Sequence, residues 1–421
     1  MAVTRLDVAE ASAHMLAGVG PLRTEEVSLR DALGRVLARD VTAPVSLPPW
    51  DNASMDGYAV HAADVRGATS NAPIRLRVVE TIAAGAFATR AVARGEAARI
   101  MTGAPVPSGA DTVVRVEDTD GGSEVVTIRD DRDAGRNVRS CGEDVRADSV
   151  VMRAGTSIGP AHVGVLASVG CASPAVHARP RVAILATGDE LVPIERFDAV
   201  RDGTRIVSSN SYALEAAVLA AGGEPVPLGI ARDDPRAIAA ALRGAEGCDL
   251  VLTSGGVSVG DFDFVRTVVE SLGGTLSLSR VRMRPGAPIA HGRLFGVPWL
   301  GLPGNPVSAL VTFELFARPL LRTLAGSRRP HRRSVSVIVD EELELGAPLT
   351  HFLRATLARN DDGRLHARLT GAQSSGMLTS MANADALLVV PPTLPRVAAG
   401  TVVAAIPLDG DLGGDERFPV P

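Results

Sequence analysis

The segment LVLTSGGVSVGDFD, residues 250–263, joins a short apolar run to a glycine-rich loop that ends in acidic residues. The apolar run at 250–253 predicts a buried strand, and a helix is expected after Asp261. Glycines let a backbone approach a ligand closely, and successive N–H groups at a turn from strand to helix can hold an anion. An ordinary glycine-rich turn would explain the same residues, so this loop alone leaves both interpretations open.

The surrounding residues 181–325 alternate apolar runs with amphipathic segments. A run at 182–186 is followed by a helical pattern from Tyr212, then by the run at 250–253 and the helix after Asp261. This alternation is typical of parallel strands joined by crossover helices, so it predicts a doubly wound α/β domain.

Three further loops of this domain follow a predicted strand or open a predicted helix: TGDE at 187–190, SSNS at 208–211 and LPGNPVS at 302–308. In the last, Asn305 suits a helix N-cap and Pro306 suits the first helical position, which is a sufficient structural explanation. Uncommitted N–H donors at the same helix start would also suit a phosphate or an oxyanion. Because open α/β sheets bind ligands at the carboxyl ends of their strands, the four loops together predict a ligand site.

The flanking regions have other patterns. Residues 7–40 have helical spacing, and turn formers at 44–58 predict a domain boundary near residue 45. Between about 70 and 150, short runs such as 74–79 and 124–128 predict a small, elongated, β-rich domain. After Arg329 short strands return, and we expect a terminal β-barrel or sandwich with strands at 335–339, 387–390 and 402–406.

Composition limits the classes of function. With 421 residues the chain exceeds the size of a single hydrophobic core, so several domains are expected. A net charge of −5, with no basic stripe interleaved with aromatics, argues against nucleic-acid binding. No apolar run is long enough for a membrane span and the start has no signal-peptide pattern, so we expect a cytoplasmic protein.

Cysteine and lysine usage excludes further chemistry. Cys141, Cys171 and Cys248 lie far apart, so neither a disulfide framework nor a zinc site is indicated. All 43 basic residues are arginine, which excludes a Schiff-base lysine and a lysine general base. Anions must therefore be bound by guanidinium groups, backbone N–H groups or a metal.

The order of five strings resembles that of MoeA-type molybdopterin molybdenumtransferases, which include the C-terminal domain of gephyrin. These strings are TGDEL, SNSYAL, TSGGVSVGDFD, MRPGAP and GLPGNPVSAL. Smaller pterin adenylyltransferases share relatives of the SGG and LPGNP loops. Residues 49–60, 100–107 and 135–145 look like MoeA elements that the smaller enzymes lack, so the long form is favoured.

The resemblance implies four parts. A discontinuous N-terminal domain would comprise residues 1–45 and 146–178, and a β-rich insertion would comprise residues 46–145. An α/β molybdopterin-binding domain would span 179–327 and a β-barrel 328–421. Family members act as homodimers, and the insertion's Asp56, Thr102 and Asp144 would complete the neighbouring subunit's catalytic site.

The reaction implied is the Mg²⁺-dependent hydrolysis of adenylylated molybdopterin with insertion of molybdate at the dithiolene, which releases AMP and molybdenum cofactor. Glu190, Asp263 and the Asp233–Asp234 pair match the family's catalytic acidic cluster. The metal ligands expected are Glu190, Asp233, Asp261 and Asp263. Asp234 adjoins Asp233, and without a metal both would be solvated helix caps. The residues expected to bind the pterin nucleotide are Thr187, Gly188, Ser254, Gly255, Gly256, Ser258, Pro303, Gly304, Asn305 and Pro306.

For the molybdate dianion, family positions match Arg284, Ser308, Arg354 and Ser375, with Ser374 adjacent to the last. The chain departs from the family at Ala287, because many relatives have KPGKP where this chain has RPGAP. A cation is thereby lost, which leaves two alternatives: a non-catalytic scaffold or cofactor carrier, and a paralogue with an altered oxyanion. Tungstate is not distinguished from molybdate, and a molybdopterin adenylyltransferase and molybdoenzymes are the expected protein partners.

Overall fold

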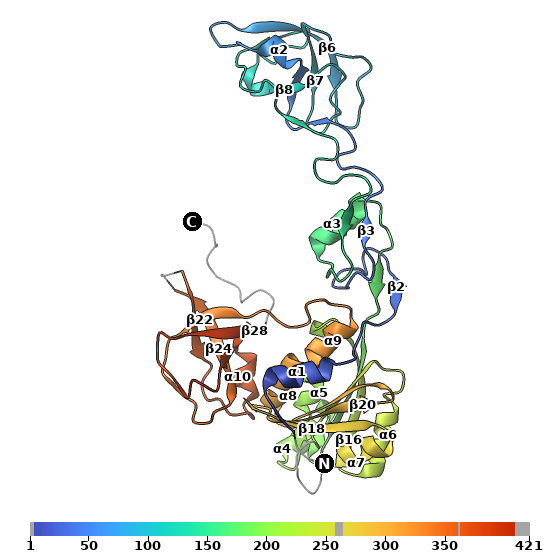
Figure 1. The fold of residues 1–421 in the computed structure, drawn as a ribbon, viewed down its shortest axis with the longest axis vertical. Helices are drawn as coiled ribbons and strands as arrows, with labels where there is room; N and C mark the ends of the chain where they lie inside the picture. Colours follow the sequence, from blue (N-terminus) through green and yellow to red (C-terminus); the bar gives the residue numbers. More distant parts are fainter. Residues whose placement is uncertain (1–3, 257–263, 361–362, 409–421) are drawn as a thin grey trace.

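The computed structural model describes residues 4–256, 264–360 and 363–408. The molecule is elongated, with a β-rich unit at one end of the long axis and an α/β unit beside a β-barrel at the other (Figure 1). No helix in these ranges is long and apolar enough to cross a membrane.

The α/β unit is built on a seven-stranded sheet. Its strands, in spatial order, are β1 (Thr4–Leu6), β18 (Thr275–Val281), β20 (Pro288–Leu294), β21 (Val297–Leu302), β17 (Leu250–Ser254), β13 (Arg181–Thr187) and β16 (Glu224–Ala231). The strands from β21 to β16 are parallel, as predicted, whereas β18, β20 and β21 pair antiparallel. The predicted strands at 182–186 and 250–253 are parallel neighbours, and the antiparallel edge is a feature that the sequence did not indicate.

A two-residue turn explains the antiparallel edge. Phe295 and Gly296 both have positive φ angles, of 52° and 82°, and they connect β20 directly to β21. Such a turn matches the right-handed twist of a hairpin, so the two strands pair without a crossover helix.

Helices cover both faces of the sheet. They are α5 (Ser209–Ala220), α6 (Pro235–Arg243), α7 (Phe264–Ser271), α8 (Pro306–Thr312), a π-helical turn (Phe313–Ala317) and α9 (Arg318–Leu324). One apolar core lies under α5, α8 and α9, and a second lies under α6 and α7. The predicted helix starts near Tyr212 and at Pro306 are thus confirmed, with Asn305 at the N-cap position.

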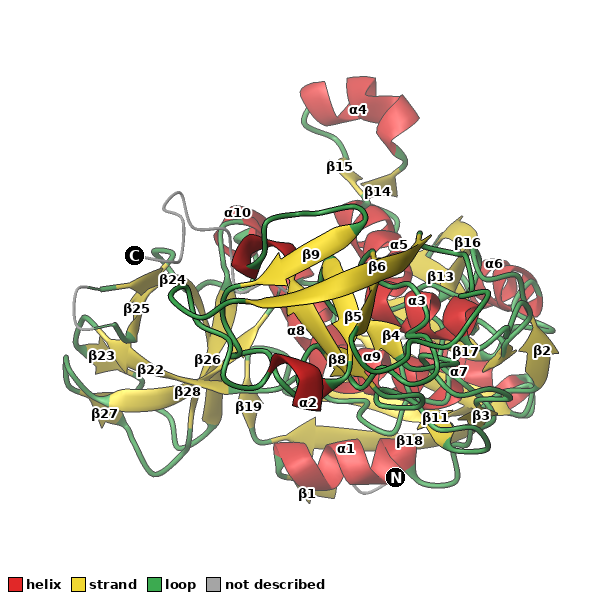
Figure 2. Ribbon diagram, turned by 90° about the horizontal axis from the view of Figure 1, so that it is seen from above, coloured by secondary structure: helices red, strands yellow, loops and turns green. Residues whose placement is uncertain are grey.

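A short excursion between β13 and α5 projects from the sheet's edge (Figure 2). We call residues 191–207 the flap. It consists of β14 (Leu191–Val192), a 3₁₀ turn (Ile194–Arg196), α4 (Phe197–Arg201) and β15 (Ile206–Val207). β14 and β15 pair with each other and hold the base of the flap together.

The first helix is shorter than its sequence pattern suggested. α1 spans Val8–Leu16 and starts at a capping box in which Asp7 and Glu10 exchange hydrogen bonds of 2.8 Å. β1 pairs with β18, and α1 packs against α9 of the α/β unit. The helical pattern predicted for 7–40 therefore holds only for its first third. The first residues of the chain pack on the α/β unit, whereas the predicted grouping of residues 1–45 assigned them to the N-terminal domain.

Two separate segments form the N-terminal domain between the ends of the molecule. β2 (Thr24–Glu26) pairs with β12 (Ala175–His177), and β3 (Val41–Thr42) pairs with β11 (Val150–Met152). These strands share a core with α3 (Pro160–Ser168), in which Leu37 and Leu166 are fully buried. The two segments therefore fold as one body interrupted by the insertion.

The insertion carries a five-stranded sheet in the order β8 (Thr112–Arg115), β5 (Gly57–Val60), β7 (Glu96–Ile100), β6 (Ile74–Ile82) and β9 (Val125–Ile128). Smaller elements accompany it: β4 (Asn52–Ala53), β10 (Val138–Arg139), α2 (Ala62–Val65) and a 3₁₀ turn (Val116–Asp118). The predicted strands at 74–79 and 124–128 are confirmed.

The C-terminal unit is a closed five-stranded barrel. Its strands are β24 (Thr350–Arg359), β25 (Leu365–Leu369), β22 (Val335–Val339), β28 (Val402–Pro407) and β26 (Ala386–Val390), which pairs back with β24. β23 (Leu343–Glu344), β27 (Arg396–Val397) and α10 (Leu378–Ala382) complete it. β19 (Met283–Arg284) comes from the α/β unit and pairs with β24, so it ties the two units together.

Candidate active site

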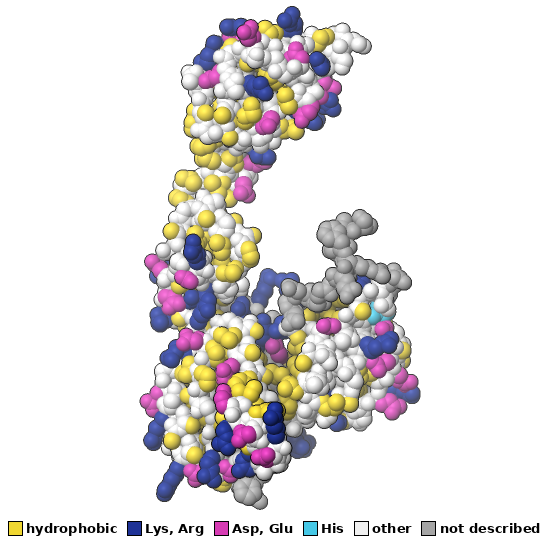
Figure 3. Space-filling view, turned by 180° about the vertical axis from the view of Figure 1, so that it is seen from behind, with side chains coloured by type: hydrophobic (Ala, Val, Ile, Leu, Met, Phe, Trp, Pro, Cys, Tyr) yellow, Lys and Arg dark blue, Asp and Glu magenta, His cyan; other side chains and the backbone are white. Residues whose placement is uncertain are grey.

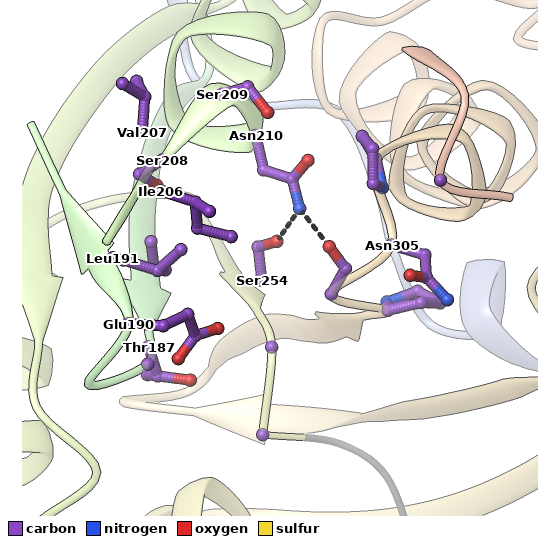
Figure 4. A pocket seen from close by; sticks show the side chains of 18 of the residues that line it. Thr187, Glu190, Leu191, Ile206, Val207, Ser208, Ser209, Asn210, Ser254 and Asn305 are labelled. Atoms are coloured by element: carbon purple, nitrogen blue, oxygen red, sulfur yellow. Dashed lines mark hydrogen bonds between the residues drawn. The ribbon is translucent and has the colours of Figure 1, made fainter. Parts of the chain in front are cut away.

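An open cleft of about 710 Å³ lies where the parallel strands of the sheet end (Figure 4). We call it the strand-end cleft. Predicted site residues from three of the four loops line it, together with Asp233: Thr187, Gly188, Glu190, Asp233, Ser254, Gly255, Gly256, Pro303, Gly304, Asn305 and Pro306. The fourth loop contributes Ser208, Ser209 and Asn210. Segments more than a hundred residues apart in the chain therefore meet at one edge of the sheet.

The floor of the strand-end cleft is a glycine turn that admits no side chain. Gly255 and Gly256 have φ angles of 92° and 62°, and a Cβ at either position would approach the Thr187 hydroxyl to 3.1 Å. The Thr187 hydroxyl is buried and has no hydrogen-bond partner among the described residues. A backbone turn and an unsatisfied hydroxyl that both line a cleft can accept an anionic ligand such as a phosphate.

Asn210 connects two of the loops. Its amide nitrogen donates to the Ser254 hydroxyl and to the Gly304 carbonyl, both at 2.8 Å (Figure 4). Asn210 sits in the first turn of α5, within one of the four predicted loops, although no role was predicted for this residue itself. The side chain therefore fixes the distance between the glycine turn and the start of α8.

Acidic residues form one wall of the strand-end cleft. Glu190 and Asp233 line it, and burial together with the charges of Asp189 and Glu190 raises the pKa of Asp233 despite a backbone hydrogen bond from Asp189. Arg232 pairs with Asp189 at 3.4 Å, on the solvent side. Carboxylates that disfavour one another's ionisation in this way would be stabilised by a cation.

The neighbouring acid, Asp234, has a different role. Its carboxylate accepts a hydrogen bond of 2.8 Å from the Ala237 N–H and caps α6. The capping interpretation that the sequence left open for the pair is therefore correct for Asp234, whereas Asp233 lines the cleft. The described residues contain no group of three or more His, Cys, Asp or Glu side chains placed to hold a metal. The predicted residues Ser258, Asp261 and Asp263 lie outside the described ranges.

A second pocket, of about 900 Å³, lies between the α/β unit and the barrel. We call it the barrel pocket. It contains the four residues predicted for the oxyanion and the unexpected alanine: Arg284, Ser308, Arg354, Ser375 and Ala287. Pro288, Pro303 and Asn305 line both this pocket and the strand-end cleft, so the two sites adjoin.

Arg354 is almost fully engaged inside the protein. It is 1% exposed, and its guanidinium donates to the carbonyls of Ala372, Gln373 and Ser374 at 3.0 to 3.4 Å and to the Ser380 hydroxyl at 3.1 Å. Burial also lowers the pKa of Arg354. Most of its donors thus shape the loop that carries Ser374 and Ser375.

The cation with most access to the barrel pocket is Arg284, which is exposed. Ser308 is buried in the first turn of α8, and the Ser375 carbonyl accepts from the Val307 N–H at 3.1 Å. The neighbouring acids are already engaged, because Glu341 accepts from the Leu369 N–H and Glu342 pairs with Arg396.

The insertion holds a third group of predicted residues, away from both pockets. Asp56 accepts hydrogen bonds of 2.7 Å from both the backbone N–H and the hydroxyl of Thr102, and these bonds lower its pKa. Asp144 lies in the segment that leads back from the insertion, where its N–H donates to the Leu47 carbonyl at 3.0 Å. Within one chain the insertion lies at the opposite end of the molecule from the strand-end cleft (Figure 1).

Fold and site together define a multidomain α/β protein with an open cleft at its strand ends. Three family profiles match in order: MoeA N-terminal region (domain I and II) at residues 6–170, a probable molybdopterin binding domain at 183–323, and MoeA C-terminal region (domain IV) at 336–408. Molybdopterin molybdenumtransferase 2 of Mycobacterium tuberculosis (strain ATCC 25618 / H37Rv) is 42% identical over 89% of this chain and 93% of its own length.

The enzyme named molybdopterin molybdenumtransferase from Bacillus subtilis (strain 168) is 36% identical over 87% of this chain and 86% of its own. A crystal structure of molybdopterin biosynthesis moeA protein from Pyrococcus horikoshii OT3 superposes with a TM-score of 0.82 at 29% identity, covering 96% of this chain and 100% of that one. The chain belongs to the MoeA family of molybdopterin molybdenumtransferases.

Proposed function

We propose that this protein hydrolyses adenylylated molybdopterin, inserts molybdate at the dithiolene and releases AMP and molybdenum cofactor. The observation that carries the proposal is the adjoining pair of sites. A cleft lined by a glycine turn and acidic side chains shares a wall with a pocket lined by an exposed arginine and three serines. A phosphoanhydride and a molybdate dianion could thus be bound side by side.

In this proposal the strand-end cleft holds the nucleotide's phosphates. The Gly255 N–H already donates to the Leu302 carbonyl at 3.2 Å, so the Gly256 N–H and the Thr187 hydroxyl would donate to phosphate oxygens. Asn210 would keep the two phosphate-facing loops at a fixed separation. Hydrolysis transfers the adenylyl phosphate to water and leaves the pterin's own phosphate behind.

The acids of the strand-end cleft fit a magnesium ion. Hard carboxylate oxygens are the ligands that Mg²⁺ prefers, and Asp233 has a raised pKa because it is buried near other carboxylates. Glu190 and Asp233, with Asp261 and Asp263, would hold the ion, which would neutralise charge that develops on the phosphates.

The two adjacent aspartates provide a test of that assignment. Asp233→Asn should lower AMP release by at least about 100-fold, because a ligand charge is lost. Asp234→Ala should leave AMP release within about twofold but reduce thermal stability by about 1 kcal/mol, because α6 loses its N-cap. Activity and melting curves of the two variants check both effects; equal activities would remove Asp233 from the site.

We further propose that the protein acts as a homodimer in the cytoplasm. Asp56, Thr102 and Asp144 lie on the insertion, away from the strand-end cleft of their own chain, so they could serve that cleft only in a second copy. A molybdopterin adenylyltransferase that supplies the substrate and molybdoenzymes that receive the product are the protein partners we infer.

The decisive experiment supplies purified protein with adenylylated molybdopterin, Mg²⁺ and molybdate, and measures AMP and active cofactor. We expect both products. Absence of AMP with every divalent metal would overturn the enzymatic proposal and favour the scaffold alternative.

Ala287 provides a test of oxyanion binding. Ala287→Lys should lower the molybdate concentration for half-maximal cofactor formation by about fivefold, because a cation near a dianion contributes about 1 kcal/mol even at high dielectric. Ala147→Lys, which adds the same charge at an exposed position outside both pockets, is the control. Equal behaviour of the two variants would mean that the missing cation has no effect, and replacing molybdate by tungstate in the same assay tests the choice of metal.

A further inference from the structure

The charges in the barrel pocket are poorly matched to a dianion. The charged residues in its described lining are two arginines and three glutamates: Arg284, Arg354, Glu341, Glu342 and Glu344. Figure 3 shows side chains of both signs on the barrel and on the α/β unit, on either side of their junction. Arg354 already donates to the carbonyls of its own loop. An oxyanion in this pocket therefore needs a second cation besides Arg284.

The remaining ionisable side chain in the described lining of the barrel pocket is that of His351. This residue is buried, with 3% of its surface exposed. It lies on β24, where its Cα is paired with that of Arg284 on β19. Successive side chains of a strand alternate between its two faces, so directly paired residues of neighbouring strands share a face. The imidazole and the Arg284 guanidinium therefore start from adjacent positions on one face.

A hydrogen bond fixes which nitrogen of the imidazole is available. His351 Nε2 lies 3.1 Å from the Ala347 carbonyl oxygen. A carbonyl oxygen only accepts, so Nε2 carries a hydrogen in both the neutral and the charged ring. Within the described residues the ring makes no other hydrogen bond. Nδ1 is thus left for a ligand, and it becomes a charged N–H donor when the ring is protonated.

The groups around the imidazole act in opposite directions on its charge. Arg284 on β19 disfavours a second positive charge, whereas the carboxylates of the pocket favour it. On the other side of β24, the paired residue of β26 is Val390, which has no charge. The segment at 345–349, which carries Ala347, has no ionisable side chain. A dianion bound beside Arg284 would therefore shift the ring towards its charged form.

We propose that His351 is the second cation of the oxyanion site: when molybdate binds, Nδ1 takes up one proton from solvent and donates that N–H to an oxyanion oxygen. No bond to molybdenum forms or breaks in this step. Histidine is the side chain that changes charge most readily near neutral pH, and a charged N–H donor bonds an anion more strongly than a neutral one. The inference rests on the proposed function in taking the barrel pocket as the oxyanion site.

The test measures molybdate binding to the full-length protein by titration calorimetry, without pterin substrate. Titrations at about pH 6.5 and 8.5, each in two buffers of different ionisation enthalpy, give the affinity and the number of protons taken up. We expect uptake of at least about half a proton per molybdate at one of these pH values, and affinity about tenfold higher at the lower pH. Absence of proton uptake, or of molybdate binding, would overturn the proposal.

His351→Gln separates the charge from the hydrogen bond to Ala347. A glutamine amide can still donate to that carbonyl but does not titrate. The variant should bind molybdate about tenfold more weakly than the native protein at the lower pH, with no proton uptake and little dependence on pH. His331→Gln is the matched control, because His331 is exposed and lines neither pocket. Proton uptake that persists in His351→Gln would contradict the assignment.

A charge rescue keeps the test decisive if His351→Gln is less stable. Ala287 lines the same pocket, and a lysine ammonium stays charged across this pH range. Adding Ala287→Lys to His351→Gln should return the affinity to within about threefold of the native value, without proton uptake. Failure of this rescue, while Ala287→Lys alone tightens binding, would show that His351 does not act through its charge.

These measurements are independent of the reaction. Molybdate binding with proton uptake in a protein that releases no AMP would reject the proposed reaction and leave the role of His351 standing. AMP release and cofactor formation in a protein that binds molybdate without proton uptake would reject the role of His351 alone.

Discussion

Mixing an Asp56→Asn variant with an Asp233→Asn variant is expected to restore AMP release that neither variant has alone. Each substitution keeps the shape of the side chain and removes its charge, so each uniform dimer should lose at least about 100-fold in rate. In a mixed dimer one site receives both mutant residues, and the other receives both native ones. Random exchange of subunits at equal concentrations gives mixed dimers in half of the population, so activity should return to about a quarter of the native rate.

The matched control pairs Asp56→Asn with Thr102→Ala. Both residues lie on the insertion and bond each other at 2.7 Å, so a mixed dimer carries one defect in each site. No activity should return in that mixture. Recovery in the control, or failure in the first mixture after subunit exchange has been verified, would show that the insertion does not serve the partner's cleft.

The strand-end loops could be predicted because their chemistry is local. Glycine at a strand-to-helix turn, proline at a first helical position and asparagine before it each indicate a conformation within a few residues. The topology then brings those loops together, since the carboxyl ends of parallel strands share an edge. Thr187, Gly255 and Asn305 were found in this way, and all three line the strand-end cleft.

Residues whose partners are distant in sequence were harder to assign. Asn210 donates to a side chain 44 residues away and to a carbonyl 94 residues away. Its position at a helix start does not indicate either partner. Asp233 and Asp234 differ in role because one precedes the N-cap and the other occupies it, which depends on where α6 begins. Because both residues are aspartates, residue type alone cannot show which one caps α6 and which one lines the cleft.

Errors in the predicted fold have the same origin. β20 and β21 pair antiparallel through a turn in which a phenylalanine adopts a positive φ, which is an unusual signal for a hairpin. β1 pairs with a strand more than 270 residues further along the chain, and β19 joins the barrel although it belongs in sequence to the α/β unit. Local periodicity predicts a strand but not its partner.

The sequence also did not indicate the hydrogen-bond partners of Arg354 inside the protein. A matching family position suggested direct contact with molybdate, whereas the structure engages its guanidinium with three carbonyls and a hydroxyl. An arginine with those partners positions the loop that carries Ser374 and Ser375, because these bonds fix the backbone from residue 372 to residue 374. Arg284, which is exposed in the same pocket, is then the cation that we propose for the oxyanion.

Arg354→Ala is therefore expected to affect stability and molybdate use together, whereas Arg284→Ala should affect molybdate use alone. Loss of the buried Arg354 guanidinium removes its hydrogen bonds to the three loop carbonyls and to the Ser380 hydroxyl, at a cost of about 3 kcal/mol in the free energy of unfolding. The freed loop should also weaken molybdate use, because Ser375 bonds the start of α8 through its carbonyl. Arg284 is exposed, so its removal should change stability by less than about 0.5 kcal/mol while raising the half-maximal molybdate concentration by about tenfold.

Thermal unfolding and molybdate titrations of cofactor formation distinguish the two arginines, and Arg354→Lys sharpens the comparison. A lysine keeps the charge but cannot donate in the planar fork that reaches Ala372, Gln373 and Ser374 at once. If Arg354 positions the loop, the lysine variant should melt nearly as early as the alanine variant and show the same weakened molybdate use. Full rescue by lysine would instead mean that the charge of Arg354, rather than its hydrogen bonds to the loop, is what the oxyanion site requires.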